Sequence, residues 1–409
     1  MKSAKFHAVA LSMIIAALLW SLGCGGDAEV SNTAPSEVAI VGTSCFIEAG
    51  GTLALAASAT DEDGDPLTYR WTATAGSFDP ASATGASVQW TAPAAEGAAT
   101  ITLTVTDDIE SVTKTFGLMV CTVFQGSVTT ARTMSAGHTY MVKSTTLLPI
   151  SGSGSLTIEP GVTVVFNQGG GFSVHGRLTA EGTAGQKIRF RGNTCESSVG
   201  AWSKIEIDGS SAEAIFRNAE ISQSEDGVMF AEEGLGGVLT LENCTVYDNK
   251  NAGIGVMGQD ATAHIRSSQV WENGTGIKIS NGTADIRSSS VSYSAANGIW
   301  ITYSLDDTHV TIDSTAVTSN GANGILLMNR ASPTVHYCSI HSNGGDSGTG
   351  YAISLIAYYG VDPIDARHNF WGAGNTTSEK IGLVIFDGVD EPGLPYVDFS
   401  EFLTTSPAE

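Results

Sequence analysis

The sequence predicts an all-β protein in which a β-sandwich precedes a solenoid of parallel β-strands. Short alternating strands separated by turn residues fill residues 34–122. Farther along, blocks that begin with an apolar residue recur at intervals of 21 to 29 residues between Phe216 and Ile364. Only 15% of the residues are charged, against about 25% in ordinary globular domains. The net charge of −23 argues against nucleic acid as a partner, because phosphate binding needs clustered Lys and Arg.

An export signal is expected over residues 1–23. A basic start precedes an apolar run, residues 8–19, which has the length of a secretory signal and is short for a membrane span. The small residue before Cys24 resembles a bacterial lipobox, which implies that Cys24 is lipidated and anchors the chain at the outer membrane or cell surface. The alternative is an ordinary signal peptide with an incidental cysteine. The small and polar residues 24–33 are expected to form a flexible tether.

The sandwich is expected over residues 34–122. Residues 52–56, 67–71 and 100–106 alternate between apolar and polar positions, and a dense turn signal occupies residues 61–66. About seven strands in such a length suggest a β-sandwich. The runs ATDEDGDPLTYRW and TITLTVTD resemble the PKD and cadherin-like group of immunoglobulin-like modules. That resemblance implies a spacer or binding module rather than a catalytic domain.

Two features of this module are candidate sites. Cys45 lies near the first strand and Cys121 near the last, and in an exported protein such a pair is expected to form a disulfide. Two buried free thiols are the alternative. Asp61, Asp63 and Asp65 place three carboxylates at alternate positions, which favours Ca²⁺. Asp also makes turns without any metal, so a solvated turn is the alternative.

Three columns of the repeat predict how each turn of the solenoid is built. The residues three positions after each block start are very small, apart from one threonine, as in Ala219 and Ser268. The residues five positions after it are aliphatic, and most of those eight positions after it are asparagines. Amides stacked at strand spacing, about 4.8 Å, can hydrogen-bond from one turn to the next. A period near 25 residues with stacked columns predicts a parallel β-helix over residues 123–372.

The blocks resemble the right-handed β-helix repeats of the pectate-lyase-like superfamily, and Asn369-Phe370-Trp371-Gly372 resembles its closing signature. Residues 373–409 are expected to form a C-terminal cap and tail, because an exposed last turn would invite edge-to-edge pairing. The side chains expected to fill the cap are Trp371, Phe386, Tyr396, Phe399 and Phe402.

The resemblance also implies polysaccharide lyases or hydrolases, so charged residues of the repeat are candidate catalytic groups. One outward column and its neighbour carry a mixture of cations and carboxylates: His264, Arg266, Asp285, Arg287 and Asp313. The catalytic hypothesis is a Ca²⁺ or uronate site with arginine as the base. The alternative is a ladder of surface charges, worth under about 1 kcal/mol for each exposed pair.

Aromatic residues of the repeat are candidate ligand contacts: Tyr247, Trp271, Tyr293 and Trp300. Aromatic rings stack on sugar rings and favour interfaces, although the same residues could pack under a loop. The sequence therefore predicts a lipid-anchored surface protein that binds a polysaccharide or an envelope protein through the β-helix face. The alternatives are a polysaccharide lyase or hydrolase, and a purely structural envelope component.

Overall fold

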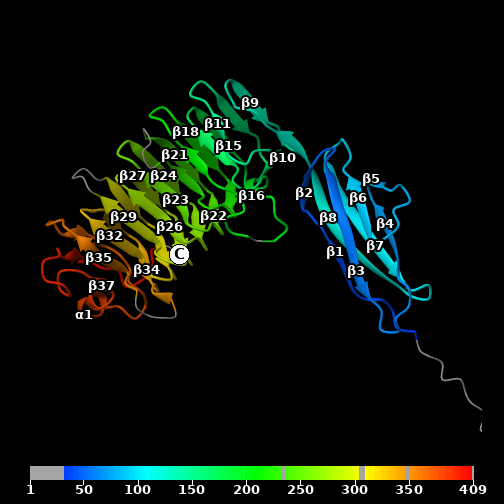
Figure 1. Ribbon diagram of the computed structural model, residues 1–409. Coiled ribbons are helices and arrows are strands. Elements are labelled where there is room, and N and C mark those ends of the chain that lie inside the picture. Colours follow the sequence, from blue (N-terminus) through cyan, green and yellow to red (C-terminus); the bar gives the residue numbers. More distant parts are fainter. Residues whose placement is uncertain (1–31, 197, 232–235, 304–308, 346–349, 408–409) are drawn as a thin grey trace, which may run out of the picture.

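The chain folds into a β-sandwich followed by a β-solenoid (Figure 1). The computed structural model describes residues 32–196, 198–231, 236–303, 309–345 and 350–407. In the sandwich, a four-stranded sheet with the order β1-β3-β6-β5 packs on a sheet formed by β2, β8, β7 and β4. Its strands are β1 Ser36–Val41, β2 Phe46–Glu48, β3 Thr52–Thr60, β4 Thr68–Ala73, β5 Ser77–Asp79, β6 Ser87–Thr91, β7 Gly97–Thr106 and β8 Ser111–Phe124.

Two tryptophans lie at the centre of the sandwich core. Trp71 and Trp90 are almost fully buried, which places large apolar surfaces between the two sheets. Their indole N–H groups donate to the carbonyls of Gly85 and Ala75, each at 3.0 Å. Both buried donors are therefore satisfied, as buried tryptophans generally are.

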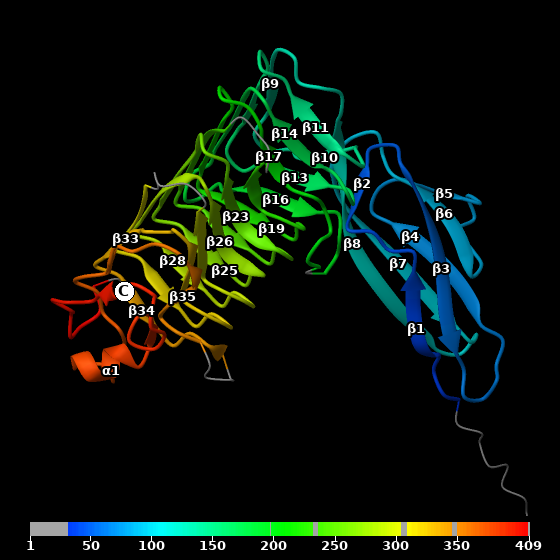
Figure 2. The ribbon, with the colours of Figure 1, turned by 60° about the vertical axis from the view of Figure 1, so that its left-hand side comes forward.

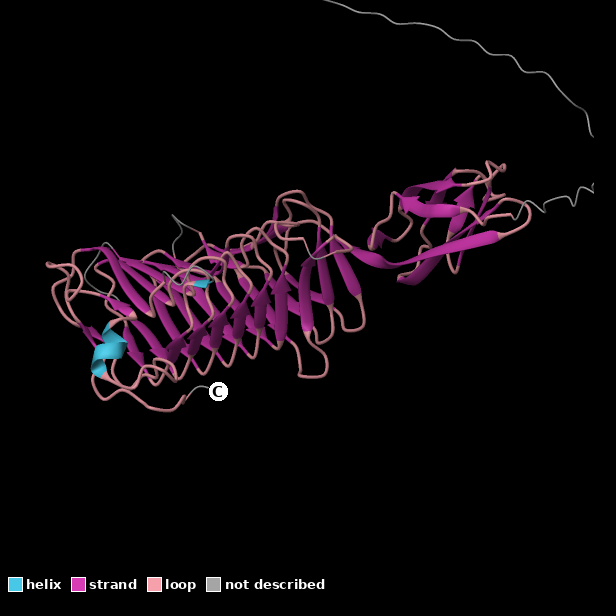
Figure 3. Ribbon diagram, turned by 90° about the horizontal axis from the view of Figure 1, so that it is seen from below, coloured by secondary structure: helices cyan, strands magenta, loops and turns pink. Residues whose placement is uncertain are grey.

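The solenoid consists of three parallel sheets, here named I, II and III in the order in which each turn visits them, and sheet I supplies nine strands, one to a turn. Figure 3 shows these strands stacked along the solenoid. Sheet I contains β9 Ala131–Met134, β12 Ser155–Ile158, β15 Arg177–Glu181, β18 Glu213–Arg217, β21 Gly237–Glu242, β24 Ala261–Arg266, β27 Thr283–Arg287, β30 Val310–Asp313 and β33 Thr334–His336. Sheet II contains β10 Thr139–Val142, β13 Thr163–Phe166, β16 Ile188–Gly192, β19 Ala219–Ser222, β22 Thr245–Tyr247, β25 Gln269–Trp271, β28 Ser290–Ser292, β31 Ala316–Thr318 and β34 Ser339–His341. Sheet III contains β11 Leu147–Ile150, β14 Gly171–Val174, β17 Ile205–Ile207, β20 Val228–Phe230, β23 Ala252–Met257, β26 Thr275–Ser280, β29 Ile299–Tyr303, β32 Ile325–Asn329, β35 Ile353–Tyr358 and β37 Ile385–Phe386.

Left-handed residues make the sharp bends between sheets. From the fourth turn on, one residue with φ between +46° and +68° stands between sheets I and II, and another between sheets II and III. The first column is Asn218, Asn243, Ser267, Ser288, Ser314 and Tyr337, and the second is Gln223, Asp248, Glu272, Tyr293, Ser319 and Ser342. Most are Asn, Asp or Ser; Asn and Asp in particular reach this conformation more readily than other side chains do. The bends are thus encoded by the polar residue that follows each strand.

The predicted asparagine column forms hydrogen-bonded ladders at the bend between sheets II and III. Asn249 Nδ2 donates to Asn273 Oδ1 at 2.8 Å, and Asn320 Nδ2 donates to Asn343 Oδ1 at 3.0 Å. Ser294 interrupts the ladder, and its buried hydroxyl has no partner among the described residues. The small column lies buried at the other bend, as predicted, where the N–H of Cys244 donates to Ser268 Oγ.

Glycines at the start of sheet III allow successive turns to come close together. A Cβ on Gly227 would lie 2.1 Å from the carbonyl oxygen of Gly253, and one on Gly298 would lie 2.8 Å from that of Gly324. Main-chain atoms cannot yield as a flexible side chain can. This close approach explains the Gly-aliphatic landmark that accompanies each repeat.

The sandwich and the solenoid share a strand. The first part of β8 pairs with β7 of the sandwich, whereas its end, Thr122–Phe124, pairs in parallel with β10 of sheet II. A single thirteen-stranded sheet therefore runs from one part into the other, and Figure 2 shows the two parts meeting at an angle there. The expected boundary between residues 122 and 123 falls inside this strand.

The predicted Cys45–Cys121 disulfide is wrong. Cys45 is bonded to Cys195, whereas Cys121 is a buried free thiol whose pKa burial raises to about 12. The parallel register of β2 and β8 pairs Phe46 with Met119 and Glu48 with Cys121. Cys45 is therefore displaced from Cys121 by about three residues, roughly 10 Å along the strand, beyond the reach of a disulfide.

The C-terminal segment covers the last turn, through β36 Ile364–Asp365, helix α1 Ser378–Gly382, β37 and β38 Val397–Asp398. Trp371 is fully buried, and Phe399 and Phe402 pack against the same core. Tyr396 is 61% exposed, so the expectation that it fills the cap is wrong. No helix of the described residues is long and apolar enough to cross a membrane.

Candidate functional site

A groove of about 650 Å³ lies on the outer face of sheet III. Register pairing across four successive turns aligns Met229, Gly255, Lys278 and Trp300 in one outward column. Met229, Lys278 and Trp300 of this column line the groove, and the end of Met229 lies over Gly255, which has no side chain of its own. Residues of the neighbouring bends close its side.

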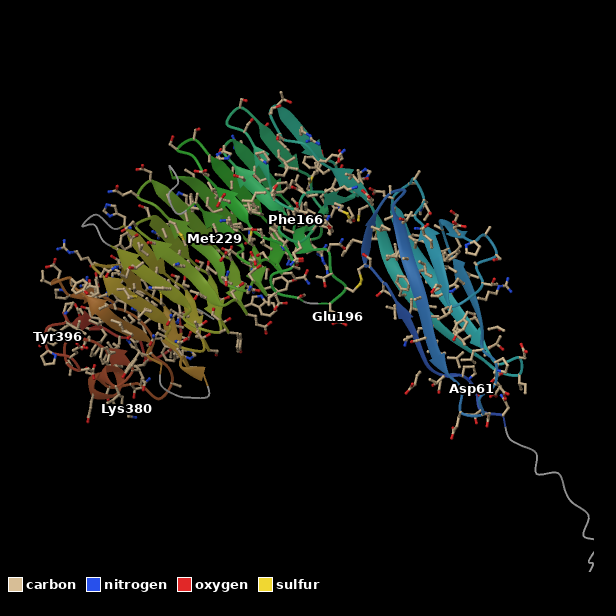
Figure 4. All side chains as sticks on the ribbon, viewed as in Figure 1. Asp61, Phe166, Glu196, Met229, Lys380 and Tyr396 are labelled. Carbon is tan, nitrogen blue, oxygen red and sulfur yellow. A yellow bond between two sulfur atoms is a disulfide. The ribbon has the colours of Figure 1, made fainter. Side chains whose placement is uncertain are left out.

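Methionines form the floor of the groove. A Cβ on Gly255 would lie 2.2 Å from Met229 Cε and 3.6 Å from Met257 Cε. Both methionines thus lie over the bare main chain of this turn, and both are buried. Methionine is unbranched and polarisable, so such a floor can adapt to the shape of a ligand. Met229 is labelled in Figure 4, midway along the solenoid.

Lys278 and Trp300 occupy the next two turns. Lys278 Nζ lies 5.1 Å from the centroid of the Trp300 ring, a cation–π contact. No described carboxylate lies within ion-pair distance of Lys278. The indole N–H of Trp300 is buried and has no acceptor among the described residues, and such unpaired donors are rare in proteins. The groove therefore holds a cation and a donor that the described part of the protein leaves uncompensated.

Three lysines gather at this groove in a strongly acidic protein. Lys204, Lys250 and Lys278 line it, and they are the only lysines in the sequence between residues 188 and 379. Lys204 pairs with Glu206 at 2.6 Å, and Lys250 lies 3.9 Å from Glu225. The groove thus combines an apolar floor and an aromatic ring with several ammonium groups. Such a site suits a ligand that has apolar faces together with hydroxyl or acidic groups. These lysines are not among the residues predicted from the sequence, although their position as the three lysines between residues 188 and 379 is a signal in the sequence itself.

The four predicted aromatic contacts are not brought together. Trp300 lies in the groove, whereas Tyr247 and Trp271 are register partners on sheet II. Their rings stack with centroids 5.0 Å apart and planes 3° apart, so each ring covers one face of the other. Tyr293 stands at the bend after β28 and is 63% exposed. Stacking of Tyr247 on Trp271 is a contact between turns, and it does not offer a flat platform across both rings.

The five predicted catalytic candidates do lie on neighbouring turns of sheet I, as a ladder of paired charges. His264 is opposite Asp285, Arg266 opposite Arg287, and Arg287 opposite Asp313. Asp285 accepts hydrogen bonds from Arg266 at 3.0 Å and from Arg287 at 2.5 Å. Arg266 and Arg287 are like charges on adjacent turns, and the carboxylate of Asp285 binds both of them.

The electrostatics of this ladder do not suit a catalytic base. Partial burial raises the pKa of Asp285, but hydrogen bonds from Arg266 and Arg287 outweigh it, and the pKa lies below its ordinary value. The hydrogen bond to Asp285 raises the pKa of Arg287. A lyase base has to give up its proton before it acts, and this arrangement holds the proton of Arg287 in place.

Asp61, Asp63 and Asp65 each place one carboxylate oxygen within 4.8 Å of the others. Asp61 Oδ1 accepts the N–H groups of Asp63 and Asp65, at 3.0 and 3.1 Å, and Asp63 Oδ2 accepts that of Thr33 at 2.7 Å. These oxygens fit a hard cation such as Ca²⁺, which prefers six to eight oxygen ligands; the same bonds hold the turn by themselves. Cys24, the predicted lipidation site, lies outside the described residues.

Comparisons with known families agree with this architecture. The model of the PKD domain matches residues 37–120, and the model of the right handed beta helix region matches residues 143–291 and 259–360, together more than half of the chain. No curated protein and no solved structure matches the chain in these comparisons. A PKD domain joined to such a helix indicates an extracellular protein associated with carbohydrate. The chain therefore belongs to the family with a right-handed β-helix region, preceded here by a PKD domain.

Proposed function

We propose that this chain is a lipid-anchored binding protein of the cell surface that recognises a polysaccharide through the groove on sheet III. One observation carries the proposal: Lys278 lies over Trp300 above the methionine floor, with no carboxylate partner among the described residues. An indole face binds the apolar face of a sugar ring. An ammonium group binds hydroxyls and, more strongly, a carboxylate or sulfate.

The two side chains can exchange contacts when a ligand binds. The lysine ammonium stands on a flexible four-carbon stem, so it can leave the Trp300 ring for an acidic group of the ligand. The sugar ring then takes its place on the indole. Lys204 and Lys250 border the same groove, and they supply further positive charge along the path of a polymer.

Cleavage of a polysaccharide has weaker support. Glycoside hydrolysis generally needs two carboxyl groups in different protonation states, and the carboxylate at the centre of the sheet I ladder is bound by two guanidiniums. The groove on sheet III is lined by lysines and one carboxylate, Asp226. Both surfaces support recognition better than acid–base chemistry.

The test is retention of the chain from residue 25 onward on a panel of neutral and acidic polysaccharides. The Trp300→Ala variant should lose about tenfold or more of its affinity. Trp271→Ala, the same substitution on sheet II, is the matched control and should retain the ligand. Equal retention by both variants would contradict the groove, and the release of new reducing or unsaturated ends would contradict binding without cleavage.

A further inference from the structure

Large apolar side chains are exposed at the end of the solenoid that the C-terminal segment covers. Four of them, here named the distal tip, are Tyr359, Val361, Val389 and Tyr396, with exposed fractions of 70%, 86%, 79% and 61%. Single exposed apolar residues are ordinary on protein surfaces, but a group of them marks an interaction site. Tyr396 is predicted to fill the cap, yet its side chain is exposed and is free to contact a partner.

Main-chain hydrogen bonds bring the distal tip together from separate segments. The N–H of Ile364, three residues beyond Val361, donates to the carbonyl of Tyr396 at 3.0 Å. A second bond of 3.0 Å closes the loop 388–395, which carries Val389. Loops far apart in the sequence therefore meet at one place and point their apolar residues outward.

A buried carboxylate braces these loops. Asp387 is 3% exposed and accepts the N–H groups of Val389 at 2.9 Å and Val397 at 2.8 Å. Hydrogen bonds to an ionised acceptor are stronger than neutral ones. The distal tip is thus held in place before any partner arrives, which lowers the entropy that binding would cost.

Carboxylates without cationic partners surround the distal tip. Residues 356–401 contain eight Asp and Glu but only two Lys and Arg. Arg367 is already engaged with Asp365 and Asp398. Asp362, Asp390 and Glu391 are exposed, and the described residues place no cation within ion-pair distance of them. A partner that covers the apolar side chains would therefore meet negative charge at the edge.

This charge decides among the kinds of partner. A second copy of the chain carries the same net charge of −23 and is repelled, as are anionic polysaccharides and anionic lipids. Only a cationic partner gains from the surrounding carboxylates. Figure 4 shows Tyr396 at the end of the molecule opposite to Asp61, so a partner can reach the distal tip without contacting the sandwich.

We infer that the distal tip is a docking surface for a basic polypeptide segment whose apolar residues pack on Val361, Val389 and Tyr396. Lysine or arginine side chains of that segment pair with Asp362, Asp390 and Glu391. This surface is separate from the groove on sheet III and does not depend on polysaccharide recognition.

The probe is a short synthetic peptide of alternating lysine and valine, titrated against the chain from residue 25 onward, with an alternating lysine and serine peptide as the charge-matched control. The valine peptide should bind about tenfold tighter, and both should weaken at higher ionic strength. The variant Val361→Ser/Val389→Ser/Tyr396→Ser should bind the two peptides alike. All three side chains are exposed, so its melting temperature should be unchanged.

A matched variant, Val41→Ser/Ile109→Ser, removes exposed apolar residues from the sandwich and should keep the preference for valine. Equal binding of the two peptides by the unmodified chain would overturn the inference. So would a preference that survives in the distal-tip variant. Self-association that the distal-tip variant abolishes would assign the surface to a second copy and would likewise overturn it.

Discussion

Cys45 of the sandwich is covalently bonded to Cys195 of the third solenoid turn, 150 residues away in the sequence. Beside this bond, Lys143 Nζ of the solenoid lies 2.8 Å from a carboxylate oxygen of Glu48 in the sandwich. Strand β8 crosses the same junction and pairs with both parts. The PKD domain is therefore joined to the first turn of the solenoid through β8 and to the third through the disulfide, and it covers strand edges that would otherwise be exposed.

Loss of the disulfide should destabilise the whole molecule. In the chain-entropy model a cross-link over this length contributes about 5 kcal/mol, and the measured loss should be smaller, because β8 still joins the two parts. Cys195→Ser should lower the denaturant midpoint. In a non-reduced digest, the peptide with Cys45 should be linked to the peptide with Cys195, and Cys121 should be alkylated only after unfolding. A link between Cys45 and Cys121 would refute the assignment.

The pairing of Cys45 with Cys195 is a feature that the periodicity of the sequence does not predict. The turns, the columns and the asparagine ladder follow from periodicity, because each residue meets its equivalent in the next turn. The partner of Cys45 depends instead on the register between β2 and β8, which no repeat encodes. The predicted export signal is a reason to expect a disulfide, but it does not indicate which cysteines the disulfide joins.

The groove was missed for a related reason. The sequence predicts Trp271 as a ligand contact in an outward column and Trp300 as a further contact on a neighbouring strand. The structure places them on different sheets, and it places Lys278 opposite Trp300 through the register of β26 and β29. Residue spacing within one turn can suggest such a column. Only the three-dimensional structure shows that Met229 lies over Gly255 and that a groove is present beside it.

Asn273→Ala should be strongly destabilising. The Asn273 side chain is 2% exposed; it accepts from the N–H and side chain of Asn249 and donates to the carbonyls of Val246 and Trp271. Alanine leaves several buried groups unpaired, at about 1–3 kcal/mol each. We expect a loss of about 3 kcal/mol in the free energy of unfolding, measured with urea. Asn251→Ala, which removes one 3.5 Å hydrogen bond at an exposed site, should cost less than about 0.5 kcal/mol, and equal losses would contradict the ladder.

Asp365 should contribute to stability only above acidic pH. The hydrogen bond from Arg367, together with His336, holds the pKa of Asp365 well below its ordinary value of about 3.9. Folding lowers the pKa of Asp365. Its contribution to stability is therefore complete at a pH above the pKa of the unfolded state, and it is lost as the pH falls through the pKa of the folded state. Asp365→Asn should therefore lower stability at pH 6, by less than about 1 kcal/mol because the group is partly exposed. The difference should vanish at strongly acidic pH.

The control for this pH experiment is Asp362→Asn, an exposed site without a cationic partner among the described residues. Its stability should follow the unmodified chain at every pH. A loss for Asp365→Asn that persists unchanged into strong acid would show that the ion pair is not its source. Unfolding by urea at a series of pH values measures both variants on one scale.

Two glycine substitutions should separate the groove from the framework. At Gly255 a new Cβ would clash with the flexible end of Met229, 2.2 Å away at Cε, and would make an ordinary contact with Met257 Cε at 3.6 Å. Met229 can therefore move outward and fill the groove. Stability should then change by less than about 1 kcal/mol, while retention on the polysaccharide ligand should fall. At Gly227 a new Cβ meets the carbonyl oxygen of Gly253 at 2.1 Å. The main chain has to move to make room at this position, so Gly227→Ala should lower the free energy of unfolding by about 1–3 kcal/mol.

The two variants are compared by urea unfolding and by retention on the same polysaccharide. Gly255→Ala should be stable but retained poorly, and Gly227→Ala should be less stable. If Gly255→Ala were retained as well as the unmodified chain, the methionine floor would not contact the ligand, and the binding surface would have to lie elsewhere on the solenoid. If Gly255→Ala lost as much stability as Gly227→Ala, the side chain of Met229 would have to be fixed in its present position. A new methyl group at Gly255 destabilises the protein only when Met229 cannot move away from it.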